Sequence, residues 1–133
     1  MALQAPQPDN HQIAALTGVS LAAVSDLVVG VYADCLGRGP TKARSYNDGD
    51  IVVCLLEDTM TKLERHLRKE GRGEILLGLR VALEKKMQEA LGAGMEALAG
   101  REVLAVVSGR QLNPDIASEV FVMGALLRDG TAS

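Results

Sequence analysis

The sequence predicts a single α+β domain, with elements in the order αββααββ and a four-stranded, mostly antiparallel sheet on which the helices pack. Apolar residues recur every three or four positions in 20–36 and again in 76–98, which is the period of one helical face. Between these stretches, Asp48-Gly49 suits the left-handed backbone of a tight hairpin turn and separates two runs of strand-like residues. A chain of 133 residues is long enough to build one core of this kind.

Three parts are expected along the chain. Residues 1–18 form an N-terminal arm that is partly flexible or helical, because Pro6 and Pro8 lie there among amide and acidic side chains. Residues 19–125 form the α+β domain, and residues 126–133 form a C-terminal tail.

The first helix of the domain is predicted over 20–36, with Ser20 as its N-cap. The string Gly-Arg-Gly-Pro-Thr-Lys then ends it, because Gly37 takes the left-handed conformation that closes a helix and Pro40 prevents continuation. Arg38 is expected to lie near the last helical carbonyls with its charge in water, so that Arg38→Ala costs little stability.

An alternative interpretation makes the same string an anion-binding loop for phosphate, bicarbonate or a nucleotide. The candidate ligands are Arg38, Gly39, Lys42 and Arg44. Against this interpretation, the loop follows a helix C-terminus, where the dipole is negative, and it lacks the Gly-x-x-x-x-Gly-Lys-Ser/Thr pattern of phosphate loops. The structural interpretation is therefore preferred, and the anion site is kept as the alternative.

The first hairpin is predicted to have its strands at 41–46 and 51–56, on either side of the Asp-Gly turn. Thr61 and Glu64 follow in the T-x-x-E spacing of a capping box, in which each side chain accepts a hydrogen bond from the other residue's free backbone N–H. A short charged helix should therefore run from Thr61 to about Glu70.

A longer helix follows, set off by Gly71 and Gly73 and ended by Gly100. The stripe predicted to face the core consists of Leu76, Leu79, Leu83, Met87, Leu91, Met95 and Leu98. The face predicted to lie in water carries Arg80, Glu84, Lys85 and Glu89. Two more strands, at 103–107 and 119–124, complete a second hairpin.

Three of the predicted strands, at 51–56, 103–107 and 120–123, are apolar on both alternating faces. An antiparallel sheet with one face in water should instead alternate apolar and polar residues. Either helices cover both faces of the sheet, or a second subunit covers one of them. We predict the latter arrangement, a homodimer.

The composition argues against nucleic acid and against the membrane interior as the main environment of the chain. The net charge is −3, and only two tyrosines and one phenylalanine are available to stack on bases. The basic run at 62–72 is most simply a solvated helix face, and a surface that binds a partner or a polyanion is the alternative. The apolar stretch at 14–33 contains Thr17, Ser25 and Asp26, so no insertion into a membrane is expected.

No catalytic residue, metal site or cofactor is expected. Cys54 lies within an apolar strand and Cys35 near a helix C-terminus, and neither place activates a thiol. His11 and His66 are the only histidines, and neither has a second ligand at metal-binding spacing. The two cysteines are expected to stay reduced, which corresponds to a cytoplasmic location.

Five stretches together resemble the MpsC-like family: "LGRGPTKARSY", "DGDIVVCLLED", "TMTKLER", "GRGEILLGLR" and "SEVFVMG". The resemblance covers roughly residues 20–124, and its most specific mark is the string at 37–42. One departure is Lys62, where family members often carry proline after the capping threonine.

The family takes its name from a Na+-linked system that generates membrane potential and is tied to inorganic-carbon uptake. The resemblance therefore implies a small non-enzymatic accessory or regulatory binding protein, with a protein of such a membrane system as its partner. The alternative from another class is a small-anion sensor or enzyme that uses the Gly-Arg-Gly-Pro-Thr-Lys loop.

Overall fold

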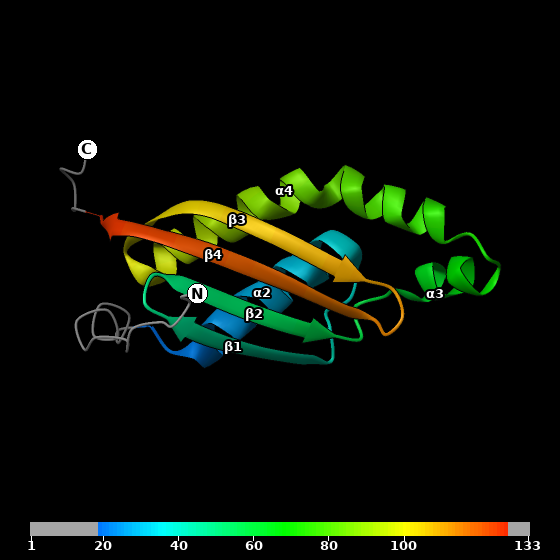
Figure 1. The fold of residues 1–133 in the computed structure, drawn as a ribbon, viewed down its shortest axis with the longest axis horizontal. Coiled ribbons are helices and arrows are strands. Elements are labelled where there is room, and N and C mark those ends of the chain that lie inside the picture. The colour runs from blue at the N-terminus through cyan, green and yellow to red at the C-terminus, as the bar shows by residue number, and fades with distance from the viewer. Residues whose placement is uncertain (1–18, 128–133) are drawn as a thin grey trace, which may run out of the picture.

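The computed structural model describes residues 19–127, so the predicted N-terminal arm and the end of the tail lie outside the described residues. The predicted order of elements is confirmed. In chain order they are α2 (Leu21–Leu36), β1 (Lys42–Asp48), β2 (Ile51–Glu57), α3 (Lys62–Lys69), α4 (Gly73–Ala99), β3 (Arg101–Gln111) and β4 (Ile116–Leu126). Figure 1 shows these elements in an elongated arrangement, with α3 beyond one end of the sheet.

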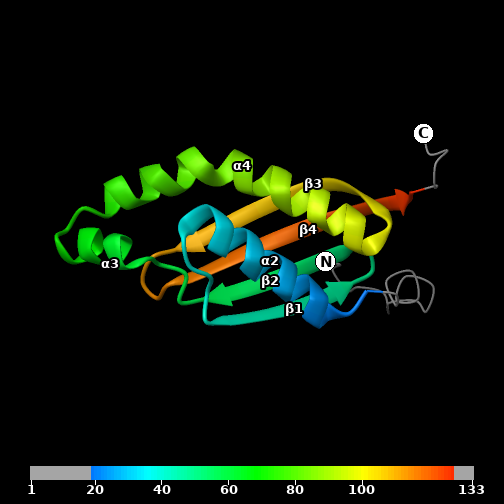
Figure 2. The same cartoon turned by 180° about the vertical axis from the view of Figure 1, so that it is seen from behind.

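The four strands form one sheet in the order β1-β2-β4-β3, and every neighbouring pair is antiparallel. Both α2 and α4 lie across the same face of this sheet, as the two opposite views in Figures 1 and 2 show. The helices therefore cover one face only within the part of the chain that the structure describes. The core fills the space between this face and the two helices.

Side chains from both helices and from the two central strands meet in this core. Its fully buried members include Val24 and Val28 of α2, Leu91 and Met95 of α4, Cys54 and Leu56 of β2, and Phe121 of β4. Along β2 and β4 every second residue is buried, which is the alternation expected of a sheet with one packed face.

The second hairpin is longer than the sequence predicted. The strands expected at 103–107 and 119–124 extend over Arg101–Gln111 and Ile116–Leu126. The prediction followed the apolar runs, whereas the ladder continues through polar pairs such as Ser108 with Glu119. Pairing with a neighbouring strand can hold polar residues in a strand that their own propensity would not favour.

Two predictions for α4 are wrong. Arg80, placed in water by the sequence, is 5% exposed, and Leu79, placed in the core, is 43% exposed. The face of α4 that meets the rest of the molecule runs through Leu76, Arg80 and Met87, so position 80 is an inner position. Apolar residues surround the first turns of α4, and periodicity there does not identify the buried side.

None of the helices within residues 19–127 combines the length and the apolar composition needed to cross a bilayer.

Candidate functional site

The loop after α2 is held close to that helix. Gly37 has φ 89° and donates its backbone N–H to the Ala33 carbonyl at 2.8 Å, which is the geometry of a left-handed helix cap. A Cβ on Gly39 would lie 2.9 Å from Cγ1 of Val29 and 3.2 Å from the Val29 carbonyl oxygen. The loop therefore needs glycine at position 37 for its dihedral angle and at position 39 for its close approach to the helix.

Replacing Gly37 should test this reading of the loop. We expect Gly37→Ala to lower the free energy of unfolding by about 1 kcal/mol, because a Cβ is disfavoured at positive φ. Gly30→Ala is the matched control, since Gly30 lies inside α2 and its Cβ would meet nothing within 4 Å. That substitution should be neutral or stabilising by about 0.5–1 kcal/mol, because alanine favours helix more than glycine does. Equal losses in urea denaturation of the two variants would contradict the cap assignment.

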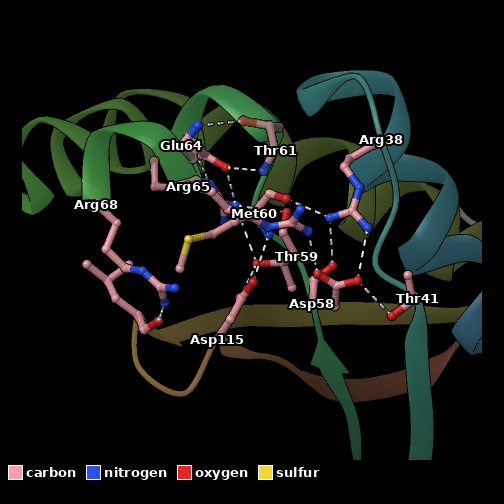
Figure 3. Close-up of polar contacts among 12 residues, drawn as sticks. Arg38, Thr41, Asp58, Thr59, Met60, Thr61, Glu64, Arg65, Arg68 and Asp115 are labelled. Atoms are coloured by element: carbon pink, nitrogen blue, oxygen red, sulfur yellow. Dashed lines mark hydrogen bonds and ion pairs between the residues drawn. The ribbon is translucent and has the colours of Figure 1, made fainter. Parts of the chain in front are cut away.

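Arg38 extends from this loop to the segment that follows β2 (Figure 3). Its Nη1 donates to the carbonyl oxygens of Asp58 and Met60 at 3.0 and 2.6 Å, and its Nη2 lies 3.1 Å from the Asp58 carboxylate. The expectation that Arg38 is a free surface charge is therefore wrong. Arg38 instead donates hydrogen bonds to two backbone carbonyls and one carboxylate.

Asp58 is the centre of a set of contacts that we call the junction, formed by the segment 58–60 and the side chains that bind it. Besides Arg38, the Asp58 carboxylate accepts hydrogen bonds from Thr41 at 3.0 Å and from Arg65 at 2.7 Å. The hydrogen bond from Arg38, followed by that from Thr41, lowers the pKa of the Asp58 carboxyl below its usual range. Asp58 itself has φ 61°, a left-handed conformation that these contacts hold in place.

The buried part of the junction is an ion pair between α3 and α4. Arg80 donates from Nε and Nη2 to the two carboxylate oxygens of Glu64 at 2.6 and 2.8 Å, and both side chains are 5% exposed. Arg80 Nη2 also donates to the Thr59 carbonyl at 3.1 Å. Burial alone would raise the pKa of Glu64, but the hydrogen bond and charge of Arg80 offset it and leave that pKa lowered.

Glu64 has a second role in the same place. Its Oε1 accepts from the Thr61 backbone N–H at 2.9 Å, and Thr61 Oγ1 accepts from the Glu64 backbone N–H at 3.1 Å, so the capping box is present. On the other side of the segment, Asp115 from the β3–β4 loop accepts from Thr59 Oγ1 at 2.8 Å and from the Met60 N–H at 2.9 Å. The junction thus ties both hairpins and all three described helices together.

The four residues considered as anion ligands do not converge in this arrangement. Arg38 faces Asp58, and Gly39 lies against α2. Lys42 and Arg44 occupy exposed alternating positions of β1, on the side away from the helices. Anion binding stays a prediction, and for Arg38 it competes with an existing ion pair.

A second buried polar cluster lies inside the core and was not predicted. Glu119 is 2% exposed; Tyr32 donates its hydroxyl to Oε2 at 2.7 Å and Ser108 donates to Oε1 at 2.6 Å. Burial raises the pKa of the Glu119 carboxyl, although both hydrogen bonds act in the opposite direction. Burial, and next the negative charge of Glu119, also raise the pKa of the Tyr32 hydroxyl above its usual range. The only sequence signal was an acidic residue at an inner position of a strand, between Ala117 and Phe121.

The sheet face opposite the helices, which we call the open face, is apolar in the half nearer the Asp48-Gly49 turn and more polar in the half nearer Lys42. Cross-strand rows run through Tyr46, Val53, Val120 and Val107, and through Asp48, Ile51, Val122 and Ala105. Val107 is 55% exposed, and Leu104, which contacts the open side of Gly124, is 59% exposed. Lys42 and Arg44 lie at one end of its β1 edge, and Asp48 lies at the other.

A groove of about 370 Å³ separates α4 from the edge strand β3. Its lining is formed by Lys85, Gln88, Glu89, Gly92, Ala93, Glu96, Val103, Ala105 and Val106. Gln88 donates to the Val106 carbonyl at 3.1 Å, and Glu96 accepts from the Val103 N–H at 2.9 Å. These side chains of α4 satisfy backbone groups on the free edge of the sheet, which protects that edge from pairing with another strand.

The fold and these surfaces define a small α+β domain with one packed and one open sheet face. The family model described as "Na+-translocating membrane potential-generating system (MpsC)" matches residues 18–125. The chain belongs to the MpsC family. No curated protein and no solved structure matches it.

Proposed function

We propose that this chain is a non-enzymatic accessory protein of a Na+-translocating membrane system and that it acts as a homodimer joined through the open face. The family supports the link to the membrane system. The observation that carries the proposal is the apolar open face, which no helix covers within residues 19–127. A contiguous apolar surface of this kind is typical of an interaction site.

The size of the open face is suited to an interface of moderate strength. Four strands about 4.8 Å apart and seven residues long at about 3.3 Å each give a flat area of roughly 450 Å². A stable interface buries about 800 Å² of accessible surface on each partner. Because accessible area exceeds flat area, the open face can supply most of such an interface, with the polar residues of β1 at its rim.

Charge supports a second copy of the chain as the occupant. Lys42 and Asp48 lie at opposite ends of β1 and point to the same side of the sheet. A two-fold axis that lies in the interface and runs across the strands would place Lys42 over the partner's Asp48, and the reverse. Opposite charges would then meet at both ends of β1, and the row of Tyr46 and Val53 would lie over the row that contains Leu55 in the second copy.

The described titratable groups support a role without chemistry. Glu64 and Glu119 are buried and hydrogen-bonded within the protein, as the contacts of Arg80 and Tyr32 show. Cys35 and Cys54 are free, and burial raises the pKa of the Cys54 thiol, which makes it less reactive. Unpaired cysteines support a reducing, cytoplasmic location. The alternative, a small-anion sensor or enzyme, now depends mainly on Lys42 and Arg44.

The oligomeric state tests the proposal. We expect sedimentation equilibrium to show a dimer at micromolar concentrations, and Val107→Lys to weaken dimerisation by at least about tenfold, because a buried lysine without a partner is costly. Val81→Lys is the matched control, since Val81 is 62% exposed but lies on α4, away from the open face. A monomeric wild type would contradict the proposal. So would a dimer that only Val81→Lys dissociates, because the interface would then lie on α4.

A further inference from the structure

The α3–α4 end of the molecule projects as an arm, formed by residues 62–83, past the end of the sheet (Figures 1 and 2). It lies opposite the end where α2 begins and β4 finishes. The base of the arm is fixed by the Glu64–Arg80 ion pair and by a hydrogen bond from Arg68 Nη1 to the Leu112 carbonyl at 2.8 Å. The arm is therefore a firmly attached projection whose outer side chains no other described element covers.

The arm is basic, although the whole chain is acidic. Residues 62–83 contain six arginines and lysines against three glutamates, a net charge of +3, whereas the chain carries −3. Lys62 and Lys69 are exposed and form no ion pair within residues 19–127. Arg65, Arg72 and Arg80 are paired with acidic groups, so the positive charge available to a partner is mainly that of these two lysines at the two ends of α3.

Large aliphatic side chains lie exposed on the same arm. Leu63 of α3 is 64% exposed; on α4 the exposed side chains are Ile75 at 38%, Leu77 at 39%, Leu79 at 43% and Val81 at 62%. A helix with apolar residues on several sides is normally buried against protein or lipid. The arm therefore presents both positive charge and large aliphatic side chains to the solvent.

We propose that the arm adsorbs to the surface of an anionic lipid bilayer, with the exposed Lys62 and Lys69 among the lipid phosphates and Leu63 in the interface. Basic residues next to aliphatic ones are the combination that binds an acidic membrane surface without spanning it. A second copy of the arm does not fit the same surface, because two tips of net positive charge repel each other.

Nucleic acid fits the arm less well than a bilayer does. Its phosphates would satisfy the lysines and arginines, but its bases would need aromatic side chains to stack on, and residues 62–83 contain no phenylalanine, tyrosine or tryptophan. Exposed leucines would stay in water in such a complex. The proposal is independent of the dimer, since the arm and the open face are separate surfaces.

Vesicle co-sedimentation of the full chain tests the proposal. We expect binding to vesicles of phosphatidylcholine and phosphatidylglycerol, little binding to phosphatidylcholine alone, and a decrease with added salt. The double variant Lys62→Glu/Lys69→Glu and the single variant Leu63→Ser should each lower the partition coefficient at least about tenfold. All three residues are exposed, and melting followed by circular dichroism verifies that the variants are folded.

The matched control is Lys85→Glu/Lys86→Glu, which makes the same charge change farther along α4 on exposed residues. It should change the partition coefficient by less than about twofold, because these lysines lie about 18 Å along the helix from the start of α4, which exceeds the Debye length of about 8–10 Å. Three results would overturn the proposal. They are no binding to phosphatidylglycerol vesicles, equal losses in the two lysine pairs, or binding to duplex DNA in place of vesicles with no effect of Leu63→Ser.

Discussion

Arg80→Ala is expected to lower the free energy of unfolding by about 3–5 kcal/mol, because it leaves Glu64 buried without its cation. Arg80 also donates to the Thr59 carbonyl, so the variant loses a hydrogen bond to the segment after β2 as well as the ion pair between α3 and α4. Urea denaturation at neutral pH measures the effect. The loss should shrink as the pH falls, because protonation of Glu64 removes the uncompensated charge.

Arg110→Ala is the matched control for this prediction. Arg110 and Glu84 approach as closely as the buried pair, at 2.6 Å, but their side chains are 20% and 34% exposed. Because solvent screens a partly exposed ion pair, its loss should cost only about 0–1 kcal/mol. Similar losses in the two variants would mean that burial does not set the importance of the Arg80 pair.

Local signals in the sequence were sufficient for most of the fold. The Asp48-Gly49 turn, the helix cap at Gly37 and the capping box of Thr61 and Glu64 each depend on residues within four positions of one another. Such short-range preferences act before any tertiary contact forms, so they can be read from the chain directly. Together with the periodicity of α2, they gave the order of elements.

The junction could not be predicted in the same way, because its contacts join residues far apart in the chain. Arg38 meets Asp58 across 20 positions, and Thr59 meets Asp115 across 56. An arginine in a loop or on a helix is usually exposed, so the sequence predicts solvent-exposed charges at Arg38 and Arg80. The tertiary fold brings Asp58 to Arg38 and Glu64 to Arg80. These partners make it favourable for the two arginines to leave the solvent.

The open face could be predicted from the sequence only in part. The sequence indicated that β2, β3 and β4 are apolar on both faces, but periodicity alone did not say which face the helices cover. The structure places α2 and α4 on the side of Cys54 and Phe121 and leaves Val53 and Val120 on the other side. The choice of face follows from the connections between elements, which a hydrophobic pattern does not encode. The homodimer stays a prediction, and the open face is the surface through which we expect the two copies to meet.

Tyr32→Phe is expected to destabilise the fold by an amount that depends on pH. The Tyr32 hydroxyl donates to the buried Glu119 carboxyl at 2.7 Å. Its loss should cost about 1.5–3 kcal/mol when that carboxyl is ionised, and about 0.5–1.5 kcal/mol when it is protonated, because hydrogen bonds to charged groups are stronger. Urea denaturation over a pH series measures both limits. A loss that is the same at every pH would show that Glu119 does not change its charge in the folded protein.

Glu119→Gln supplies the matching variant, since glutamine keeps the shape of the side chain and cannot ionise. The folded-state pKa of Glu119 is raised, mainly by burial, while Arg110 nearby lowers it and Glu84 raises it. A carboxyl with a raised folded-state pKa stabilises the fold most below its unfolded pKa of about 4.3, and this contribution is lost as the pH rises through the folded-state pKa. The variant should lack that loss, so its stability relative to wild type should increase with pH and then level off. Asp58 and Glu64, whose pKa values are lowered, give the opposite slope in both proteins and cancel in the difference. A difference that does not vary with pH, or that decreases as the pH rises, would contradict the assignment of a raised pKa to the carboxyl beneath Tyr32.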